Sequence, residues 1–131
     1  MHEIVIKKST FISYVYEVQN KDQINQIIAN LRKEYKKARH ICSAYVLEDQ
    51  YKNLNGGYDD DGEPKNTAGM PIFDLIQIKN IKNVLVVVIR YFGGVKLGAS
   101  GLIRAYRKSA NVAIDEYLKE KNNENSIKSK K

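Results

Sequence analysis

The sequence predicts one α/β (α+β) domain: a two-layer sandwich with helices packed on a mixed sheet of about four strands. Three observations support this fold class. Segments with strand-like and helix-like hydrophobic periods follow one another in the order ββαβαβα. A continuous run of Val, Leu and Ile at 84–89 is typical of a strand buried on both faces. The length of 131 residues is that of a single domain.

Two strands are expected at the N-terminus. Residues 2–8 alternate around Ile4 and Ile6, and residues 11–18 alternate over a longer stretch. Residues 9–10, a Ser-Thr pair, are expected to form the connection or a bend between them.

A helix is predicted to follow from Asn20. Asn20 suits the N-cap position, and Gln23 three residues later completes a capping-box pattern. The helix has one apolar stripe at helical spacing, made of Ile24, Ile27, Ile28, Leu31 and Tyr35.

A third strand and a second helix occupy the middle of the chain. Residues 40–47 form the strand, and residues 49–65 are predicted to be a polar loop with several glycines. Pro71 fits the first turn of a short helix over about 70–78, because proline is tolerated there.

The last strand and helix complete the domain, which is expected to span residues 1–118. The strand covers 84–92, a glycine-rich segment follows, and the last helix covers about 100–118. Residues 119–131 contain five lysines, two glutamates and one apolar side chain. Such a segment buries too little apolar surface to order itself, so we expect a basic, disordered tail.

Composition indicates the cellular compartment and the kind of partner to expect. A single cysteine, Cys42, leaves no partner for an internal disulfide and is typical of a reducing compartment. The N-terminus has no signal-peptide pattern, and the apolar run at 84–89 is too short to cross a bilayer. We therefore expect a cytoplasmic protein without a membrane partner. The net charge of +7 favours polyanionic partners by long-range attraction.

Five motifs occur in the order and spacing of the N-terminal domain of the IMPACT/YigZ family, which this chain resembles. They are HICSAY at 40–45, DDGEP at 60–64, TAGMP at 67–71, VVVIRYFGGVKLG at 86–98 and GLIRAY at 101–106. The chain differs in one motif, because Lys65-Asn66 stands where the family usually has a serine-glycine pair.

The resemblance implies the fold of the second domain of a small-subunit ribosomal protein, with a left-handed βαβ crossover. Eukaryotic relatives regulate translation by competing for an activator of a stress-responsive kinase. Bacterial relatives have been suggested to bind nucleic acid, and no reaction is firmly assigned to the family. Typical bacterial members also carry a second, ferredoxin-like domain, which we expect this chain to lack.

An acidic loop precedes the short helix. It places four carboxylates within five residues, three of them being Asp60, Asp61 and Glu63. These three could hold Mg²⁺ or Ca²⁺, since hard cations prefer oxygen ligands. Alternatively, Asp60 and Glu63 cap a turn or pair with Arg90 and Arg104, which we favour because the calcium-loop pattern is not met.

The acidic loop is also where a catalytic site would be sought. The candidates are His40 as a general base with Asp60, Asp61 and Glu63 as carboxylates. Cys42 lies two residues from His40 on one strand face, but we interpret it as a small buried hydrophobe.

The glycine-rich segment and the last helix form a candidate anion site. Backbone N–H groups at a helix N-terminus bind anions, and basic side chains add charge. Gly93 and Gly98 have the spacing of a phosphate-binding loop, but Ala99 replaces the required lysine, which argues against an ATPase. The candidate residues are Arg90, Gly93, Gly94, Lys96, Gly98, Ser100, Arg104, Arg107 and Lys108.

Three functions follow from these patterns. The first is a translation-associated or nucleic-acid-binding regulatory domain that contacts RNA phosphates through the glycine-rich segment and the basic helix. The alternatives are a metal-assisted hydrolase of a phosphate compound that uses the loop 60–63, and a protein–protein regulator of translation. We favour binding over catalysis, expect no cofactor and no disulfide partner, and expect RNA or a ribosome-associated factor as the partner.

Overall fold

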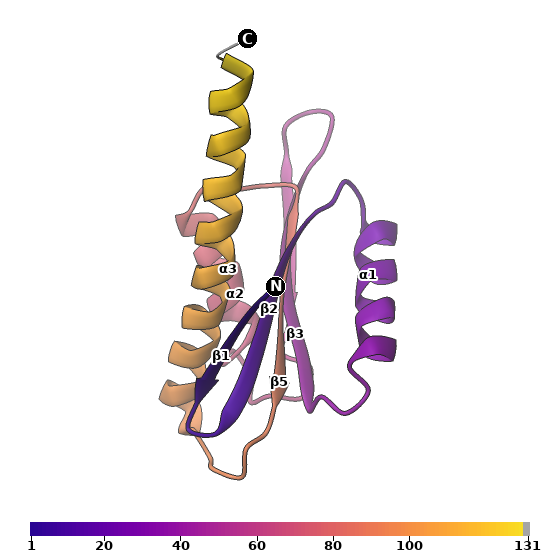
Figure 1. The fold of residues 1–131 in the computed structure, drawn as a ribbon. Coiled ribbons are helices and arrows are strands. Elements are labelled where there is room, and N and C mark those ends of the chain that lie inside the picture. The colour runs from indigo at the N-terminus through magenta and orange to yellow at the C-terminus, as the bar shows by residue number, and fades with distance from the viewer. Residues whose placement is uncertain (130–131) are drawn as a thin grey trace.

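The computed structural model describes residues 1–129, and side chains through Glu124 (Figure 1). The strands are β1 (His2–Ile6), β2 (Ser9–Glu17), β3 (His40–Glu48), β4 (Leu54–Asp59) and β5 (Val84–Tyr91). The helices are α1 (Lys21–Glu34), α2 (Gly69–Ile78) and α3 (Gly98–Ser129). None of the described helices is long and apolar enough to cross a membrane.

The five strands form one sheet in the order β1-β2-β5-β3-β4, and every neighbouring pair is antiparallel. The central strand is β5, whose residues 84–89 are fully buried, as the apolar run predicts. Both β2 and β3 run antiparallel to β5 and are therefore parallel to each other. Helix α1 joins them, so β2, α1 and β3 make a βαβ crossover with β5 between the two strands.

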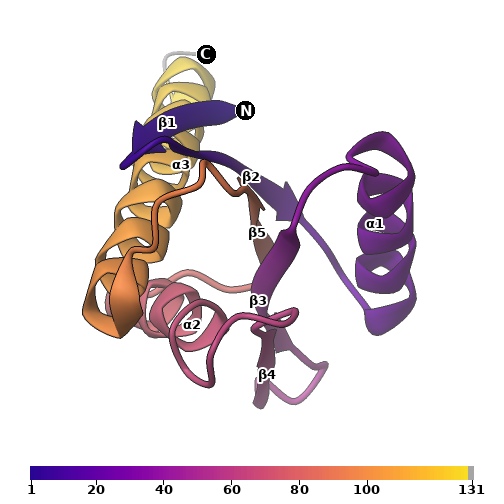
Figure 2. The same cartoon turned by 90° about the horizontal axis from the view of Figure 1, so that it is seen from below.

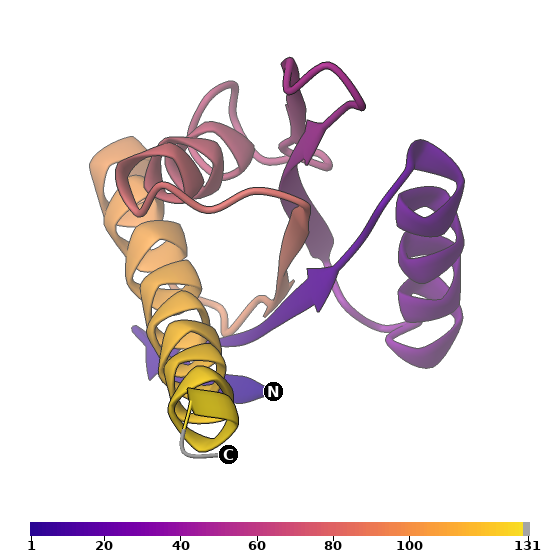
Figure 3. The same ribbon diagram turned by 90° about the horizontal axis from the view of Figure 1, so that it is seen from above.

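Helices cover both faces of the sheet. Figure 2 shows α1 on one side and α2 and α3 together on the other, and Figure 3 shows the same separation from the opposite end. Alternate residues of β5 accordingly enter two cores: Leu85, Val87 and Ile89 face α1, whereas Val84, Val86 and Val88 face α2 and α3.

The predicted α/β class is confirmed, with corrections to its details. The sheet has five strands instead of about four, it is antiparallel instead of mixed, and its helices form two layers around it. A strand buried on both faces needs a covering layer on each side of its sheet. The apolar run at 84–89 therefore already indicated that both faces of the sheet are covered.

The additional strand, β4, lies inside the predicted polar loop. Its sequence includes Gly56 and Gly57, and glycine is depleted in strands. At Gly56 a Cβ atom would lie 2.5 Å from the Phe73 ring, and at Gly57 it would lie 2.8 Å from the Tyr45 ring. Close packing against these rings therefore explains the glycines better than a flexible loop does.

The hairpin at the N-terminus turns earlier than predicted. Lys7 and Lys8 have φ angles of 46° and 70° and form the turn between β1 and β2. Ser9 and Thr10, predicted to be the connection, are the first residues of β2. A two-residue hairpin turn of type I′ requires positive φ at both central residues, and the two lysines adopt it although glycine or asparagine is usual there.

The start of α1 is confirmed and the end of α3 differs from the prediction. The Asn20 side chain accepts a hydrogen bond from the Gln23 N–H at 2.9 Å. Helix α3 continues to Ser129, beyond the helix end predicted near residue 118; disorder of the tail in solution stays a prediction, and residues 130–131 lie outside the described range. Lysine and glutamate are good helix formers, and no glycine or proline follows Gly101 to end the helix.

Candidate functional site

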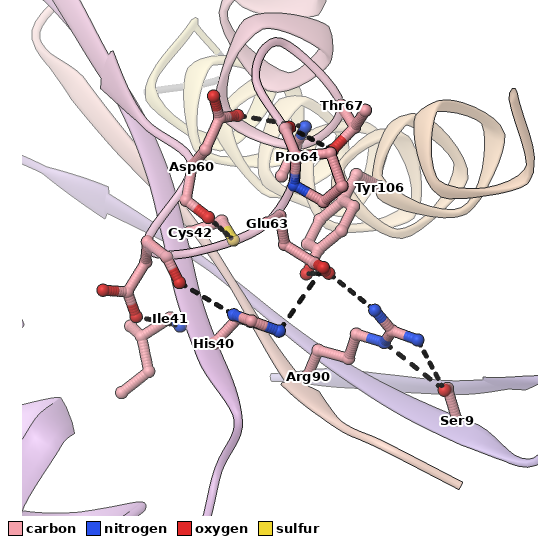
Figure 4. Close-up of polar contacts among 12 residues, drawn as sticks. Ser9, His40, Ile41, Cys42, Asp60, Glu63, Pro64, Thr67, Arg90 and Tyr106 are labelled. Carbon is pink, nitrogen blue, oxygen red and sulfur yellow. Dashed lines mark hydrogen bonds and ion pairs between the residues drawn. The ribbon is translucent and has the colours of Figure 1, made fainter. Parts of the chain in front are cut away.

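A buried polar network lies where β3, β5, α3 and the acidic loop meet (Figure 4). Its centre is Glu63, only 8% exposed. The Glu63 carboxylate accepts hydrogen bonds from Arg90 Nη1 at 2.8 Å and from the Tyr106 hydroxyl at 2.5 Å, both through Oε2. Burial raises the pKa of Tyr106, so its hydroxyl stays protonated and donates. A buried carboxylate requires such partners, because an unpaired charge would be strongly destabilising.

Arg90 is held from two sides. Its side chain reaches back to β2, where Nε and Nη2 donate to the Ser9 hydroxyl at 3.3 and 3.2 Å. The guanidinium also lies 5.7 Å from the centroid of the Phe11 ring, within cation–π range. Arg90, only 5% exposed, thus joins β2, β5 and the acidic loop.

His40 connects the network to the acidic loop. Its Nε2 lies 3.3 Å from Glu63 Oε1, and its Nδ1 lies 2.8 Å from the Asp61 carbonyl oxygen. Both neighbouring atoms are acceptors, so only a protonated ring donates to both at once. Both ring nitrogens are therefore engaged, and His40 links Glu63 to the acidic loop instead of standing free as a general base.

Asp60 caps the segment that leads into α2. Its carboxylate accepts hydrogen bonds from three backbone N–H groups, those of Asn66 (2.9 Å), Ala68 (3.2 Å) and Gly69 (2.8 Å). Free N–H groups at a helix start need such an acceptor, and a negative charge also suits the positive end of the helix. The Asp60 carboxylate therefore has a structural role at the start of α2.

Asp61 fastens the loop to α1 and β3. It binds the Arg32 guanidinium with both oxygens at 3.1 Å and accepts from the Ile41 N–H at 2.7 Å. Burial alone would raise the pKa of Asp61, but the bonds from Arg32 and Ile41 outweigh it and hold the pKa below its ordinary value.

The three carboxylates therefore do not form a common metal site. Asp60, Asp61 and Glu63 bind separate partners, and no group of three potential ligand side chains gathers in the part of the chain that the structure describes. The structure contains the alternative arrangement: Asp60 caps the start of α2, and Glu63 pairs with Arg90. Arg104, the other predicted partner, pairs with neither carboxylate. Cys42 is fully buried, and burial raises the pKa of its thiol, so it lacks the features of a nucleophile.

A surface pocket of about 320 Å³ opens above the network; we call it the Phe92 pocket. Its apolar walls are Pro64, Phe92, Leu97 and Leu102, and the first turn of α3 forms one side. Its polar lining consists of Arg39, His40, Glu63, Arg90 and Lys96. The pocket thus combines an apolar interior with an excess of cations.

Two further grooves lie beside α3. The Lys7 groove, on the β1 side of the helix, shares Leu97 with the Phe92 pocket and is also lined by Lys7, Arg104 and Lys108. The Lys79 groove, on the α2 side, shares Arg104 and Lys108 with the Lys7 groove and adds Lys79 and Arg107. We call these three neighbouring depressions together the α3 track.

The structure brings most, but not all, of the predicted site residues together. His40, Glu63, Arg90, Lys96 and Gly98 line the Phe92 pocket, while Arg104, Arg107 and Lys108 line the grooves beside it. A second set does not line the α3 track: Asp60, Asp61, Gly93, Gly94 and Ser100.

Gly93 has a structural role. A Cβ atom at Gly93 would lie 1.9 Å from the Lys8 carbonyl oxygen, so the β1–β2 turn packs directly on its backbone. Gly94 and Gly98 instead have positive φ angles of 89° and 73°, which glycine adopts without strain. The glycines therefore shape the segment before α3.

The sequence did not indicate several contributors to this region. Ser9 and Tyr106 complete the buried network, and Arg39 and Phe92 line the pocket. Tyr106 gave a partial signal, since a tyrosine on the apolar face of a helix needs a partner for its hydroxyl. Ser9 gave none, because its partner Arg90 lies 81 residues away in the sequence.

The fold and the site define a small α/β domain with a five-stranded antiparallel sheet, a buried Glu–Arg–Tyr network and a basic track along its last helix. The sequence model described as the Impact N-terminal domain matches residues 7–114. The chain belongs to this family, the IMPACT family.

Individual relatives agree with this assignment. The IMPACT family member YvyE of Bacillus subtilis is 43% identical over 116 residues, covering 87% of this chain and 52% of the relative. The IMPACT family member YigZ of Escherichia coli is 35% identical over 109 residues, covering 83% of this chain and 53% of the relative. The chain thus spans about half the length of these relatives.

Two solved structures share the fold. A crystal structure described as that of a hypothetical protein has a TM-score of 0.82 and 33% identity, covering 87% of this chain and 55% of that one. The two-domain translational regulator Yih1 has a TM-score of 0.58 and 29% identity, covering 85% of this chain and 45% of that one.

Proposed function

We propose that this domain is a translation-associated module that binds RNA through the α3 track. The contacts are mainly to the phosphate backbone, because phosphates are what exposed Lys and Arg side chains along a groove recognise in any sequence. The proposal concerns this domain, since the chain spans only part of its relatives.

The observation that carries the proposal is the charge of the α3 track. Its basic lining residues are Arg39, Arg90, Lys96, Lys7, Arg104, Lys108, Lys79 and Arg107. Among the side chains that the structure describes, its only acidic lining residue is Glu63, and that carboxylate is already paired with Arg90, as Lys79 is with Asp115. A polyanion placed along the track therefore meets several cations and no free carboxylate.

The cations on α3 are also available for binding. Arg104, Arg107 and Lys108 are exposed, and no ion pair engages them among the side chains described through residue 124. A protein that needed these charges only for solubility would not require them in neighbouring grooves.

The relatives supply the link to translation. Yih1 is described as a translational regulator, and its structure resembles this chain over 85% of the chain. The metal-assisted hydrolase is less well supported, because Asp60, Asp61 and Glu63 are each engaged by protein groups and lack a common ligand position. A regulator that binds another protein would use the same surface with a different salt dependence, which the following experiment measures.

The test is the affinity for a single-stranded RNA oligonucleotide across a salt series. Binding should weaken steeply with salt, and Arg104→Ala with Arg107→Ala should flatten the slope by roughly 0.7 to 1 unit per lost contact. The matched control is Lys33→Ala with Lys36→Ala, which removes the same charge from the α1 side of the sheet. Absence of binding at low salt, or an equal effect of both double variants, would refute the proposal.

A further inference from the structure

We infer that the Phe92 pocket receives one unstacked nucleobase of the bound RNA strand. The inference rests on the proposed function and deepens it, because it assigns a base-binding position within a track otherwise suited to phosphates. The ligand class is a purine or pyrimidine nucleotide presented by single-stranded RNA.

The chemistry of the pocket is wrong for an anion alone. Its walls are Pro64, Phe92, Leu97 and Leu102, so most of its interior is apolar. A phosphate or a carboxylate placed there would lose water without gaining partners on those walls. A ligand that fills it must have an apolar body and a charge near its edge, and a nucleotide has both.

Phe92 provides a stacking surface. Phe92 is 40% exposed, which is unusual for a phenylalanine that has a core beside it. The guanidinium groups of Arg39 and Arg90 lie 5.1 and 5.6 Å from the ring centroid, so the pocket contains an aromatic ring together with guanidinium planes. Proteins that bind single-stranded RNA stack splayed bases on these two kinds of surface.

The pocket also has the appropriate size and polar groups. Its volume of about 320 Å³ lies at the lower end of the roughly 300–1,000 Å³ typical of ligand sites, which suits a small ligand such as one base. His40 and Glu63 on its polar side are engaged with each other and with Asp61, Arg90 and Tyr106, so the Arg39 guanidinium is the donor left for the edge of a base. Lys96 lines the same pocket and can pair with the attached phosphate.

The neighbouring Lys7 groove offers a place for the backbone. Leu97 lines both the Phe92 pocket and the Lys7 groove, so a strand whose base enters the pocket has Lys7, Arg104 and Lys108 beside it. This arrangement requires the base to be unpaired, because a base within a duplex cannot leave the stack without breaking its pair.

The first measurement compares small probes on the whole chain by NMR titration or calorimetry. Adenosine, cytidine, guanosine and uridine 5′-monophosphates should bind, whereas ribose 5-phosphate, which carries the same phosphate without a base, should bind at least tenfold more weakly. Equal binding of ribose 5-phosphate would identify a simple anion site and overturn the inference. Equal competition by an oligoglutamate peptide would instead indicate an acidic protein partner and overturn it as well.

The second measurement uses variants of Phe92 with single-stranded RNA. Phe92→Ala should weaken binding by about 5- to 100-fold, the range that stacking of one base provides, without changing the salt slope. Phe92→Leu keeps an apolar side chain without a ring and should lose nearly as much. Full affinity of Phe92→Leu, or equal affinity of the wild type for duplex RNA, would contradict base insertion. The thermal unfolding midpoint serves as the folding control for both variants.

The two proposals fail in different ways. Steep salt dependence with no effect of the Phe92 variants would leave RNA binding by the track intact and refute only the base position. No RNA binding at low salt, together with tight nucleotide binding that depends on Phe92, would refute the RNA proposal and identify the pocket as a mononucleotide site.

Discussion

Two charged regions of this domain have opposite roles although both look like functional sites in the sequence. The acidic loop holds Asp60, Asp61 and Glu63, and every one of these carboxylates binds backbone N–H groups or cationic side chains of the protein itself. The first turns of α3 hold Arg104 and Arg107, which are exposed and line the Lys79 groove.

The comparison teaches that the density of charge does not identify a binding site. A carboxylate whose lone pairs accept internal hydrogen bonds has little left for a ligand, and removing it costs folding free energy. A cation that contacts only water can be removed at little cost to folding but can bind a phosphate. The predictions below test this difference, from the largest expected change to the smallest.

The largest effect is expected at Glu63. Replacing Glu63 with Ala leaves Arg90 buried and without its charge partner, and breaking a buried pair in this way typically costs about 3–5 kcal/mol. Equilibrium unfolding in urea measures the loss. Glu63→Gln keeps the size and one acceptor oxygen and should lose less than Glu63→Ala. Unchanged stability of Glu63→Ala would show that the network is not what holds the loop.

Asp60 should have a smaller but clear effect. Asp60→Ala removes the acceptor of three backbone N–H groups ahead of α2, so we expect a loss of about 2 kcal/mol in urea unfolding. Asp60→Asn retains one oxygen and should recover part of this stability. If both variants lost the same amount, the negative charge would matter more than the hydrogen-bond geometry.

Asp61 should make stability depend on pH in the acid range. Its folded-state pKa lies below the ordinary 3.8, so its contribution is present above about pH 4 and is lost as the pH falls through the lower, folded-state value. Asp61→Asn should therefore show a shallower loss of stability below pH 4 than the wild type. The energy involved is small, because Arg32 is about half exposed and water screens the pair. Parallel slopes of both proteins between pH 4 and pH 2 would contradict the assignment.

The smallest effect on folding is expected on α3. Arg104→Ala and Arg107→Ala should change the free energy of unfolding by no more than about 0.5 kcal/mol, as is usual for exposed side chains without partners. The same variants should weaken RNA binding, so stability and binding would change independently. A destabilisation as large as that of Asp60→Ala would show that these arginines are structural, and the contrast between the two regions would disappear.

Much of the fold could be predicted where local patterns are strong. The N-cap at Asn20, the helix start near Pro71 and the buried strand at 84–89 depend on residues within a few positions of one another. Strand β4 was not predicted, because its glycines suggested a loop. The reason for these glycines is close packing against the rings of Phe73 and Tyr45, which belong to other elements of the fold. The predicted end of the last helix at residue 118 also relied on composition alone, and α3 continues to Ser129.

The candidate site likewise has features that local sequence patterns predict and features that depend on the tertiary structure. The sequence by itself determined the family, the α/β class, the basic face of the last helix and the residues of the acidic loop, because motifs and helical spacing are local. Only the tertiary structure decided which charges are engaged: Glu63 meets Arg90 and Tyr106, which lie 27 and 43 residues away. Pairing across such distances depends on how strands and helices pack, so it is fixed by the whole fold and not by any local pattern.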